Sequence, residues 1–415
     1  MLIYSGNGAL NLEQTTNNDN SINLTNDTNS IGIYKVSDDA LTTAAPITLK
    51  DTTSSIGILS KNSTGLTTNT GKITGTGLTK SVGIAAEGAT TITNKGAIDV
   101  EGTGVVGLVA KGSTATINSI GATIKANGNS SAAVYTENGS VNLEGGTINA
   151  EGGAIDLYAN GGLIKVSDNN TATAINTGQK SLAFMTANGG KINFVSSTTA
   201  TIQGGSDAPT RGTAFYYTPS GLSVTPGTAS TYGSFSNLGT DLTAAFNGTL
   251  NNLTLDMQSG SRLMIASNIN ASLTNTTDAS IKGALPGLNF TGSTDYKTAM
   301  LYLSYLNVDK AVNLDDTNDD YNKLEISNSS VENNSTITGT QANQVAIAQE
   351  NIYNNPFNIN WVTLTNNGTI NLSGAGSTGM YAKSGIIKNT SNITVGDSST
   401  GIYGIDNSQI SNTGT

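Results

Sequence analysis

The sequence predicts an all-β fold: a parallel β-helix, or solenoid, built from coils of about 24 residues, with an irregular insertion in the middle. Three observations predict it. A short sequence motif, here called the phrase, recurs at a nearly regular interval. The residues around it alternate between inward and outward positions as they do in strands, and the chain carries little charge. Charged residues make up 12% of the 415 positions, about half the usual share. Stacking explains the shortage, because equivalent side chains of successive coils lie about 4.8 Å apart and like charges there would repel.

The recurring phrase is Gly-apolar-Tyr or a close variant of it. It occurs as "SIGIY" around Gly32, "SVGIA" around Gly83 and "TGMY" around Gly379. In "IDLY", Asp156 occupies the glycine slot. From Gly32 to Ala214 the slot returns every 23 to 31 residues. A period of this length is typical of a stacked-repeat fold.

Whole coils repeat as well as short phrases. The stretch "TNKGAIDVEGTGVVGLVAKGS" (93–113) aligns without a gap with "TNNGTINLSGAGSTGMYAKSG" (365–385), and nine of 21 positions are identical. Thr, Val, Ile, Asn and Gly dominate these runs, so they favour strands over the helices of other solenoids. The Leu-x-x-Leu-x-Leu frame of leucine-rich repeats is absent. Asn-x-Gly corners suit sharp turns, because both residues tolerate the left-handed conformation.

Strict alternation predicts which side chains face the core. In "AIDLYA", Ile155 and Leu157 are expected inside, and Asp156 and Tyr158 on the solvent side. In "SIGIYK", the same register places both isoleucines inside. Thr, Ser and Asn at equivalent positions are expected to hydrogen-bond from coil to coil.

The period divides the chain into three parts. Repeats are predicted over 1–215 and 301–415, and an irregular insertion or excursion over 216–300, which holds three of the six prolines. Within it, "SNLGTDLTAAFNGTL" is expected to form a short helix, and 253–267 a hairpin or two strands. The apolar run "TAMLYLSYLN" is expected to re-enter the stack. A smaller loop is predicted at 355–361. Insertions in rod-like proteins often carry binding.

Composition excludes several classes of function. The net charge is −10 and there are only two arginines, so a nucleic-acid partner is not expected. Without His or Cys, a Ser–His–Asp triad, thiol catalysis and zinc fingers are excluded. No apolar run approaches the roughly 18 residues of a membrane span, and no signal peptide is recognisable. The chain stops in mid-motif at "ISNTGT", so we expect a fragment of a longer protein. No cofactor and no enzymatic activity are predicted.

The densest acidic cluster is "DDTNDD". As a calcium loop it would offer Asp316, Asn318 and Asp320. However, Tyr321 replaces the turn glycine, and no Glu closes the loop at its twelfth position. A solvated turn is the favoured interpretation, with a calcium site or a catalytic carboxylate pair as alternatives.

Aromatic residues recur in one slot of the phrase. Stacked coils would place Tyr135, Tyr158, Met185 and Tyr216 in one outward row. Such a row can bind a glycan or a partner protein; the favoured alternative is a structural ladder that shields the backbone. Tyr34, Tyr381 and Tyr403 occupy the same slot. The predicted binding residues are Tyr135, Tyr158, Tyr216, Tyr217, Arg262 and Tyr302.

The phrases "VGIAAEGATTITNKGAIDVEG" and "TGMYAKSGIIKNTSNITVGDSSTGIYGID" resemble the passenger repeats of type V (Va) autotransporters. Their cadence is most similar to the large fusobacterial outer-membrane adhesins of the RadD-like group. The resemblance covers nearly the whole chain and implies a right-handed β-helix that is secreted through an outer-membrane barrel and displayed on a Gram-negative cell. It also implies adhesion to host cells and coaggregation with other bacteria. No binding residue is implied by it.

Three functions remain open. The first is a non-enzymatic, cell-surface adhesin fragment that binds a host-cell protein or glycan, or the surface of another bacterium. The second is a structural stalk whose parent protein binds elsewhere. The third is a polysaccharide-active enzyme, since parallel β-helices include such enzymes.

Overall fold

The structure, a computed structural model, describes the chain except residues 1–2, 6–9, 13–20, 220–231, 350–361 and 407. It is a parallel β-solenoid of about 15 turns, which confirms the predicted fold. Each turn contributes one strand to each of three faces, and neighbouring strands on a face pair in parallel. The predicted loop at 355–361 lies outside the described residues.

The first face starts as a twelve-stranded sheet and continues, in chain order, as a three-stranded one. Its strands are β1 (Ile3–Ser5), β4 (Ile31–Lys35), β7 (Ile56–Lys61), β10 (Val82–Glu87), β13 (Val106–Lys111), β16 (Ala132–Glu137), β19 (Ile155–Asn160), β22 (Leu182–Ala187), β25 (Thr213–Tyr217), β28 (Arg262–Ser267), β31 (Lys297–Tyr302) and β34 (Leu324–Ser327), then β37 (Val345–Gln349), β40 (Thr378–Lys383) and β43 (Thr400–Ile405).

The second face consists of an eight-stranded and a seven-stranded sheet. Its strands are β2 (Leu10–Leu12), β5 (Leu41–Thr43), β8 (Thr67–Asn69), β11 (Thr91–Asn94), β14 (Thr116–Ile120), β17 (Ser140–Glu144), β20 (Leu163–Val166) and β23 (Lys191–Phe194), then β26 (Gly233–Ser234), β29 (Ile269–Ser272), β32 (Tyr305–Val308), β35 (Ser330–Asn333), β38 (Thr363–Asn366), β41 (Ile386–Asn389) and β44 (Gln409–Asn412).

The third face consists of a ten-stranded and a four-stranded sheet. Its strands are β3 (Ile22–Thr25), β6 (Ile47–Lys50), β9 (Ile73–Thr79), β12 (Ile98–Thr103), β15 (Thr123–Asn127), β18 (Thr147–Glu151), β21 (Ala174–Thr177), β24 (Thr198–Ile202), β27 (Leu253–Met257) and β30 (Asn289–Gly292), then β33 (Val312–Asn313), β36 (Thr336–Gly339), β39 (Thr369–Leu372) and β42 (Ile393–Val395).

The core is a narrow apolar column along the axis, in which like side chains stack. Ile33 pairs with Ile58 on the first face, and Ile22 with Ile47 on the third, all almost fully buried. Buried polar side chains at the corners bond between coils, as predicted. For example, the Asn69 amide donates to Asn94 Oδ1 at 2.8 Å. Such ladders satisfy buried polar groups without adding charge.

The strict alternation predicted for the first face is wrong at the glycine slot. A Cβ on Gly32 would lie 2.7 Å from the Gly57 carbonyl oxygen and 3.4 Å from Ile22 Cγ2, so the slot faces the core. Asp156, in this slot, is fully buried rather than on the solvent side, and Leu157 beside it is buried too. Because Asp156 and Leu157 both face inward, the alternation is reversed before them. Ile155 therefore faces outward and is partly exposed.

The solenoid continues through the region expected to be an excursion. β25 pairs with β28 and β28 with β31 on the first face, while β24 pairs with β27 on the third. Thus 253–267 forms two strands on different faces. The expected short helix is confirmed as α1 (Leu238–Ala245), and a second, α2 (Asp278–Gly283), follows. Short 3-10 helices within the described residues are η1 (Asp168–Asn170), η2 (Ala208–Thr210), η4 (Phe235–Asn237), η5 (Leu250–Asn252) and η6 (Asp320–Lys323).

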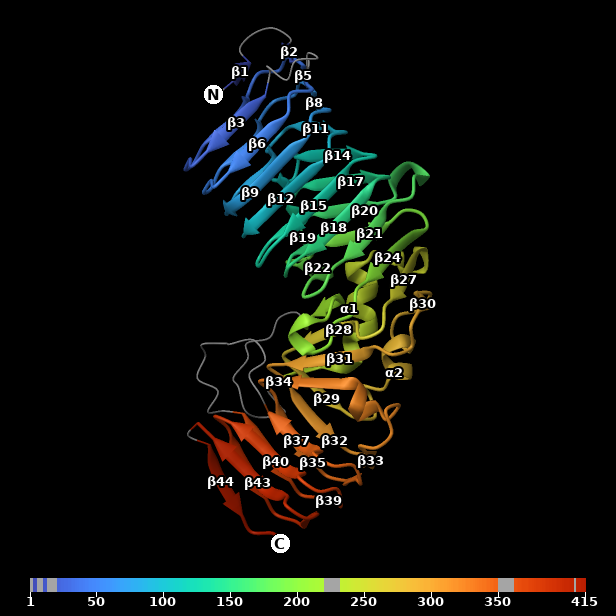
Figure 1. The fold of residues 1–415 in the computed structure, drawn as a ribbon. Coiled ribbons are helices and arrows are strands. Elements are labelled where there is room, and N and C mark those ends of the chain that lie inside the picture. Colours follow the sequence, from blue (N-terminus) through green and yellow to red (C-terminus); the bar gives the residue numbers. More distant parts are fainter. Residues whose placement is uncertain (1–2, 6–9, 13–20, 220–231, 350–361, 407) are drawn as a thin grey trace.

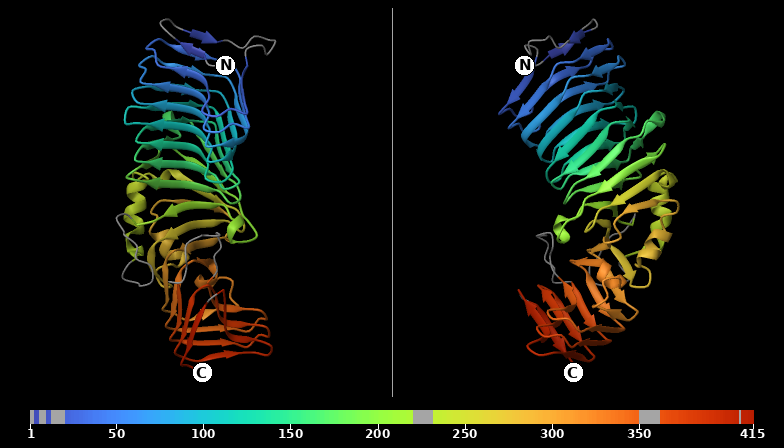
Figure 2. Two further views of the ribbon diagram at one scale, coloured as in Figure 1. Left: turned by 90° about the vertical axis from the view of Figure 1, so that its left-hand side faces the viewer. Right: turned by 45° about the vertical axis from the view of Figure 1, so that its right-hand side comes forward.

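The rod is bowed, with β22 and β31 toward its inner side and α2 toward its outer side (Figures 1 and 2). An aromatic cluster fills the bend: Phe246, after α1, lies 5.9 Å from Phe194 and 5.4 Å from Phe215, ring centroid to centroid. Past α1, Thr249 Oγ1 accepts the Phe194 N–H at 3.0 Å, and Asn252 Nδ2 donates to the Phe194 carbonyl at 2.7 Å. The inserted segment therefore covers the open edge of β23.

Candidate functional site

The outer surface of the first face carries the predicted row of aromatic and apolar side chains. Register pairs Val109 with Tyr135, Tyr135 with Tyr158, and Tyr158 with Met185. The Tyr135 and Tyr158 ring centroids lie 5.1 Å apart. Burial, and then the neighbouring Tyr135, raise the pKa of Tyr158. We call this the tyrosine row: Tyr34, Leu59, Ala85, Val109, Tyr135, Tyr158 and Met185.

A second apolar row runs beside the first and was missed by the sequence prediction. It starts with Ile31 and Ile56 and reaches Leu182. These side chains are partly exposed, whereas Ile33 and Ile58 beside them are almost fully buried. The inward-facing glycine slot causes this. From Ile31 to Leu182 the residue before the slot is apolar in every coil, and this was the available signal. We call this the isoleucine row: Ile31, Ile56, Val82, Val106, Ala132, Ile155 and Leu182.

Charged pairs follow the two rows at the ends of the same strands. Lys61 Nζ lies 3.1 Å from Glu87 Oε2, and Lys111 Nζ lies 3.3 Å from Glu137 Oε2. Opposite charges alternate from coil to coil, so each ladder position is neutralised by its neighbour. The face therefore has an apolar strip with a charged rim along one side.

The other predicted binding residues lie farther along the first face. Tyr216 is partly exposed and pairs with Ile265, so it extends the tyrosine row. Tyr302, at the end of β31, is also partly exposed. Tyr217 is buried, and its hydroxyl donates to Asp241 Oδ2 at 2.8 Å. Burial and this carboxylate raise the pKa of Tyr217, and the prediction that Tyr217 contacts a partner is corrected.

Arg262 is also buried, because the chain's two arginines converge on one carboxylate. Its side chain is 1% exposed, and its Nη2 lies 2.5 Å from Glu325 Oε2. Arg211 Nε donates to Glu325 Oε1 at 2.8 Å. Arg262 also donates to Ala208 O at 2.7 Å. The prediction that Arg262 binds a partner directly is corrected: it anchors the turn that carries Arg211.

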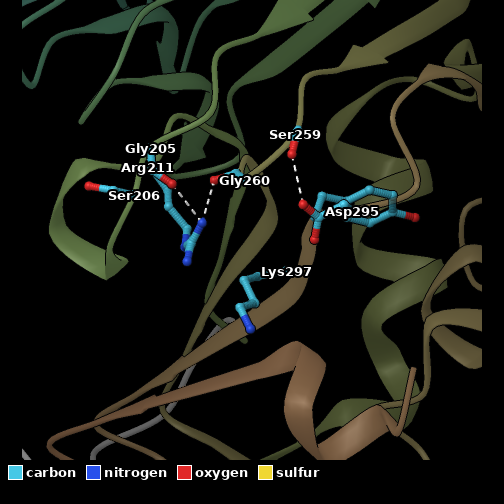
Figure 3. Close-up of a pocket in the computed structure, with 8 residues that line it drawn as sticks. Gly205, Ser206, Arg211, Ser259, Gly260, Asp295 and Lys297 are labelled. Carbon is cyan, nitrogen blue, oxygen red and sulfur yellow. Dashed lines mark hydrogen bonds between the residues drawn. The ribbon is translucent and has the colours of Figure 1, made fainter. Parts of the chain in front are cut away.

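A polar recess opens beside this cluster, at the corner between the third and first faces (Figure 3). Arg211 Nη1 donates to the carbonyl oxygens of Gly205 and Gly260, at 2.8 and 2.6 Å. Ser259 Oγ donates to Asp295 Oδ2 at 2.7 Å. We call it the arginine recess. Its volume is about 320 Å³, and it is lined by Gly205, Ser206, Arg211, Ser259, Gly260, Asp295, Tyr296 and Lys297.

Lys297 supplies a second cation to the arginine recess. Its Nζ donates to the Asn322 carbonyl at 2.7 Å, and it has no ion-pair partner among the described residues. Burial lowers the pKa of Lys297, Glu325 opposes that shift, and Arg211 adds to it. An anion entering the recess would offset the repulsion between the two cations.

A second recess, the amide recess, lies at the same corner in the preceding coils. Its volume is about 510 Å³. Asn176 Nδ2 donates to Asn149 Oδ1 at 2.9 Å, and Gln179 Nε2 donates to Gly204 O at 2.9 Å. The lining residues are Asn149, Glu151, Gly152, Asn176, Gly178, Gln179, Lys180 and Gln203.

The acidic loop at 315–320 is organised by its own hydrogen bonds rather than around a cation. Asp316 Oδ1 accepts the Asn318 N–H at 2.9 Å, and Asp320 Oδ2 lies 2.5 Å from Lys310 Nζ. Asp319 caps η6 by accepting the Tyr321 N–H. In the described part of the chain, no three acidic, His or Cys side chains are grouped closely enough to hold a metal ion. The loop is a capped turn, and the calcium interpretation finds no support.

Comparison with protein-family models and with curated protein sequences finds no match. Across the described residues, no helix is long and apolar enough to cross a membrane. The resemblance to autotransporter passengers therefore stays a prediction.

Proposed function

We propose that this chain is a non-enzymatic binding rod, the displayed passenger of a cell-surface adhesin, and that its first face docks a protein on another cell. The observation that carries the proposal is the pair of apolar rows, which lies on the outside of the solenoid over seven coils. Leu59, Ala85 and Ala132 in these rows are nearly buried, and the other members are partly exposed. The largest apolar patch on a protein surface is often functional.

The dimensions of the strip suit the centre of an interface. Seven coils spaced at about 4.8 Å give a length of roughly 30 Å, and three residues along each strand give a width of roughly 10 Å. An area on the order of 300 Å² is smaller than the roughly 800 Å² that each partner buries in a standard interface. The strip would form the apolar core of such an interface, and the Lys–Glu pairs part of its rim.

The chemistry of the strip favours a protein over a sugar as the partner. The isoleucine row offers no hydrogen bond to a hydroxyl group, so a bound saccharide would leave polar groups unsatisfied there. Aliphatic and aromatic side chains of a partner protein carry no such cost. The hydrogen bond from Asn160 Nδ2 to the Tyr135 hydroxyl, 2.9 Å long, also holds that ring in place before binding, which reduces the entropy lost on binding.

The test is binding of residues 1–415, fluorescently labelled, to host cells and to partner bacteria. We expect Ile155→Asp and Tyr158→Asp each to reduce binding at least ten-fold, because each places a charge in the apolar strip. Thr93→Asp is the matched control, since Thr93 is partly exposed on the second face. Unchanged binding by both strip variants, with folding verified by circular dichroism, would contradict docking through the first face. No binding by the unsubstituted chain would favour the structural stalk.

A further inference from the structure

We infer that the corner between the third and first faces is a binding site for an acidic saccharide. The carboxylates of this saccharide are spaced apart along the sugar chain. This inference rests on the proposed binding role but uses a different surface. The site consists of the amide recess and the arginine recess together.

The two recesses form one line along the axis. The turns that follow β18, β21, β24, β27 and β30 contribute their walls in chain order. Gln203 lines the amide recess and Gly205 the arginine recess, so only Gly204 separates them. Backbone hydrogen bonds continue the line, from Gly205 N to Gly260 O at 3.1 Å and from Gly260 N to Asp295 O at 2.7 Å. An extended ligand would thus meet a new coil about every 4.8 Å.

The cationic end is preorganised. The Arg211 side chain is 12% exposed, and Glu325, Gly205 and Gly260 hold its Nε and Nη1. Its Nη2 has no hydrogen-bond partner among the described residues. Lys297 Nζ makes one hydrogen bond and keeps further donors. Both side chains line the recess, and Figure 3 shows them near each other. Two fixed cations with unused donors are suited to a carboxylate.

The local charge selects the kind of anion. Three cations, Arg211, Arg262 and Lys297, lie around two carboxylates, Glu325 and Asp295, which leaves one net positive charge. The whole chain carries −10. A densely charged polyanion would be repelled by this excess of negative charge, whereas a saccharide with isolated carboxylates would place one at the two cations.

The remaining groups match the hydroxyls and amides of sugars. Asn149, Asn176, Gln179 and Gln203 present amides in the amide recess, and Asp295 and Ser259 present an acceptor and a hydroxyl in the arginine recess. Amide groups donate to and accept from hydroxyls, and a carboxylate accepts from them. Neutral sugar units therefore fit the amide recess, and a uronic acid unit fits the arginine recess.

The experiment is calorimetric titration of residues 1–415 with a hexasaccharide of alternating glucuronate and N-acetylglucosamine. Its control ligand is the same hexasaccharide with every carboxylate reduced to the alcohol. We expect the acidic ligand to bind and the reduced one to bind at least ten-fold more weakly, because a charge-assisted hydrogen bond is lost. Lys297→Met should weaken the acidic ligand by a similar factor. Lys95→Met, at an exposed lysine in the turn between β11 and β12, is the matched control and should leave the affinity unchanged.

Equal binding of the two ligands would overturn the inference, as would equal losses for Lys297→Met and Lys95→Met. If neither ligand binds while the labelled chain still binds cells, the saccharide site is wrong and the proposed function stands. If Ile155→Asp abolishes cell binding without changing the hexasaccharide affinity, the two surfaces are independent and the inference is supported.

Discussion

From Ile22 to Ile202 each coil repeats the same three strands, whereas between Gln203 and Glu325 helices and long turns interrupt the coils. In the regular stack, apart from the buried Lys35 and Asp156, charged side chains such as Lys61 and Glu87 lie at the surface, and the core is mostly aliphatic. In the interrupted region, both arginines are buried or nearly so. Where the two regions join, Phe184 and Phe194 of the regular stack meet Phe215 and Phe246 of the interrupted region in one cluster.

The difference follows from stacking. A residue in a regular coil must be compatible with the same position one coil above and below, which limits buried side chains to those that stack on themselves. The strands of the interrupted region still pair, but unlike side chains meet there, as Arg262 does with Thr213 and Lys297. A single Arg can therefore be placed there once. The irregular region is consequently where unique side chains, and the arginine recess, are found.

The largest effect that tests the difference between the two regions is expected at Glu325. Glu325→Ala leaves Arg211 and Arg262 without their carboxylate, and Arg262 is 1% exposed. We expect a loss of about 3–5 kcal/mol in the free energy of unfolding, because a buried charge loses its partner. Urea denaturation followed by circular dichroism measures it.

Glu151→Ala is the matched control in the regular stack. Glu151 Oε2 lies 2.8 Å from Lys125 Nζ, but these side chains are 48% and 31% exposed. Water and salt screen such a pair, so a loss below about 1 kcal/mol is expected. Similar losses for the two variants would mean that the interrupted region does not depend on its buried ion pairs.

The sequence was sufficient to predict the architecture because the architecture is periodic. The interval between Gly32 and its later equivalents predicted the turn length, and the Tyr slot predicted the register of Tyr135 on Tyr158. Coil-to-coil ladders, such as Asn69 to Asn94, followed from the same period. These features depend on local patterns that repeat, which one sequence can display.

The candidate site was less predictable because it depends on contacts that occur once. Arg211 and Glu325 are 114 residues apart in sequence, and no spacing rule connects them. The inward slot was misjudged for a different reason. A binary pattern cannot register that a Cβ on Gly32 would lie 2.7 Å from the Gly57 carbonyl oxygen. The glycine slot therefore faces the core together with the residue after it, and the isoleucine row before it faces outward.

Asp156 provides a second test of the difference between the two regions, since it is a single acid buried inside the regular stack. Burial raises its pKa well above the usual range, while Thr177, whose hydroxyl donates to Oδ2 at 2.6 Å, and the Ala150 backbone oppose the shift less strongly. The unfolded carboxyl has a pKa of about 3.9. Above that pH, the folded protein keeps a proton that the unfolded chain has released, so stability falls as pH rises towards the raised folded pKa.

We therefore expect stability to fall by up to about 1.4 kcal/mol per pH unit over that window, and Asp156→Asn to remove the fall. Urea denaturation between pH 4 and pH 8 measures it in both proteins. The two curves should differ least at acidic pH and most at neutral pH. Parallel curves would mean that Asp156 is ionised in the folded protein.

The smallest expected effect compares an exposed ladder with a buried one inside the regular stack. Asn160 donates to the partly exposed Tyr135 hydroxyl at 2.9 Å, and water can replace that partner. Asn160→Ala should cost about 0.5–1 kcal/mol.

Asn94 is fully buried, accepts from Asn69 and donates to Gly96 O at 2.9 Å. Asn94→Ala should lower the free energy of unfolding by about 1–3 kcal/mol, because it leaves buried hydrogen-bonding groups without a partner. Thermal denaturation ranks the two. A larger loss for Asn160→Ala would mean that the tyrosine row stabilises the solenoid rather than serving as a binding surface.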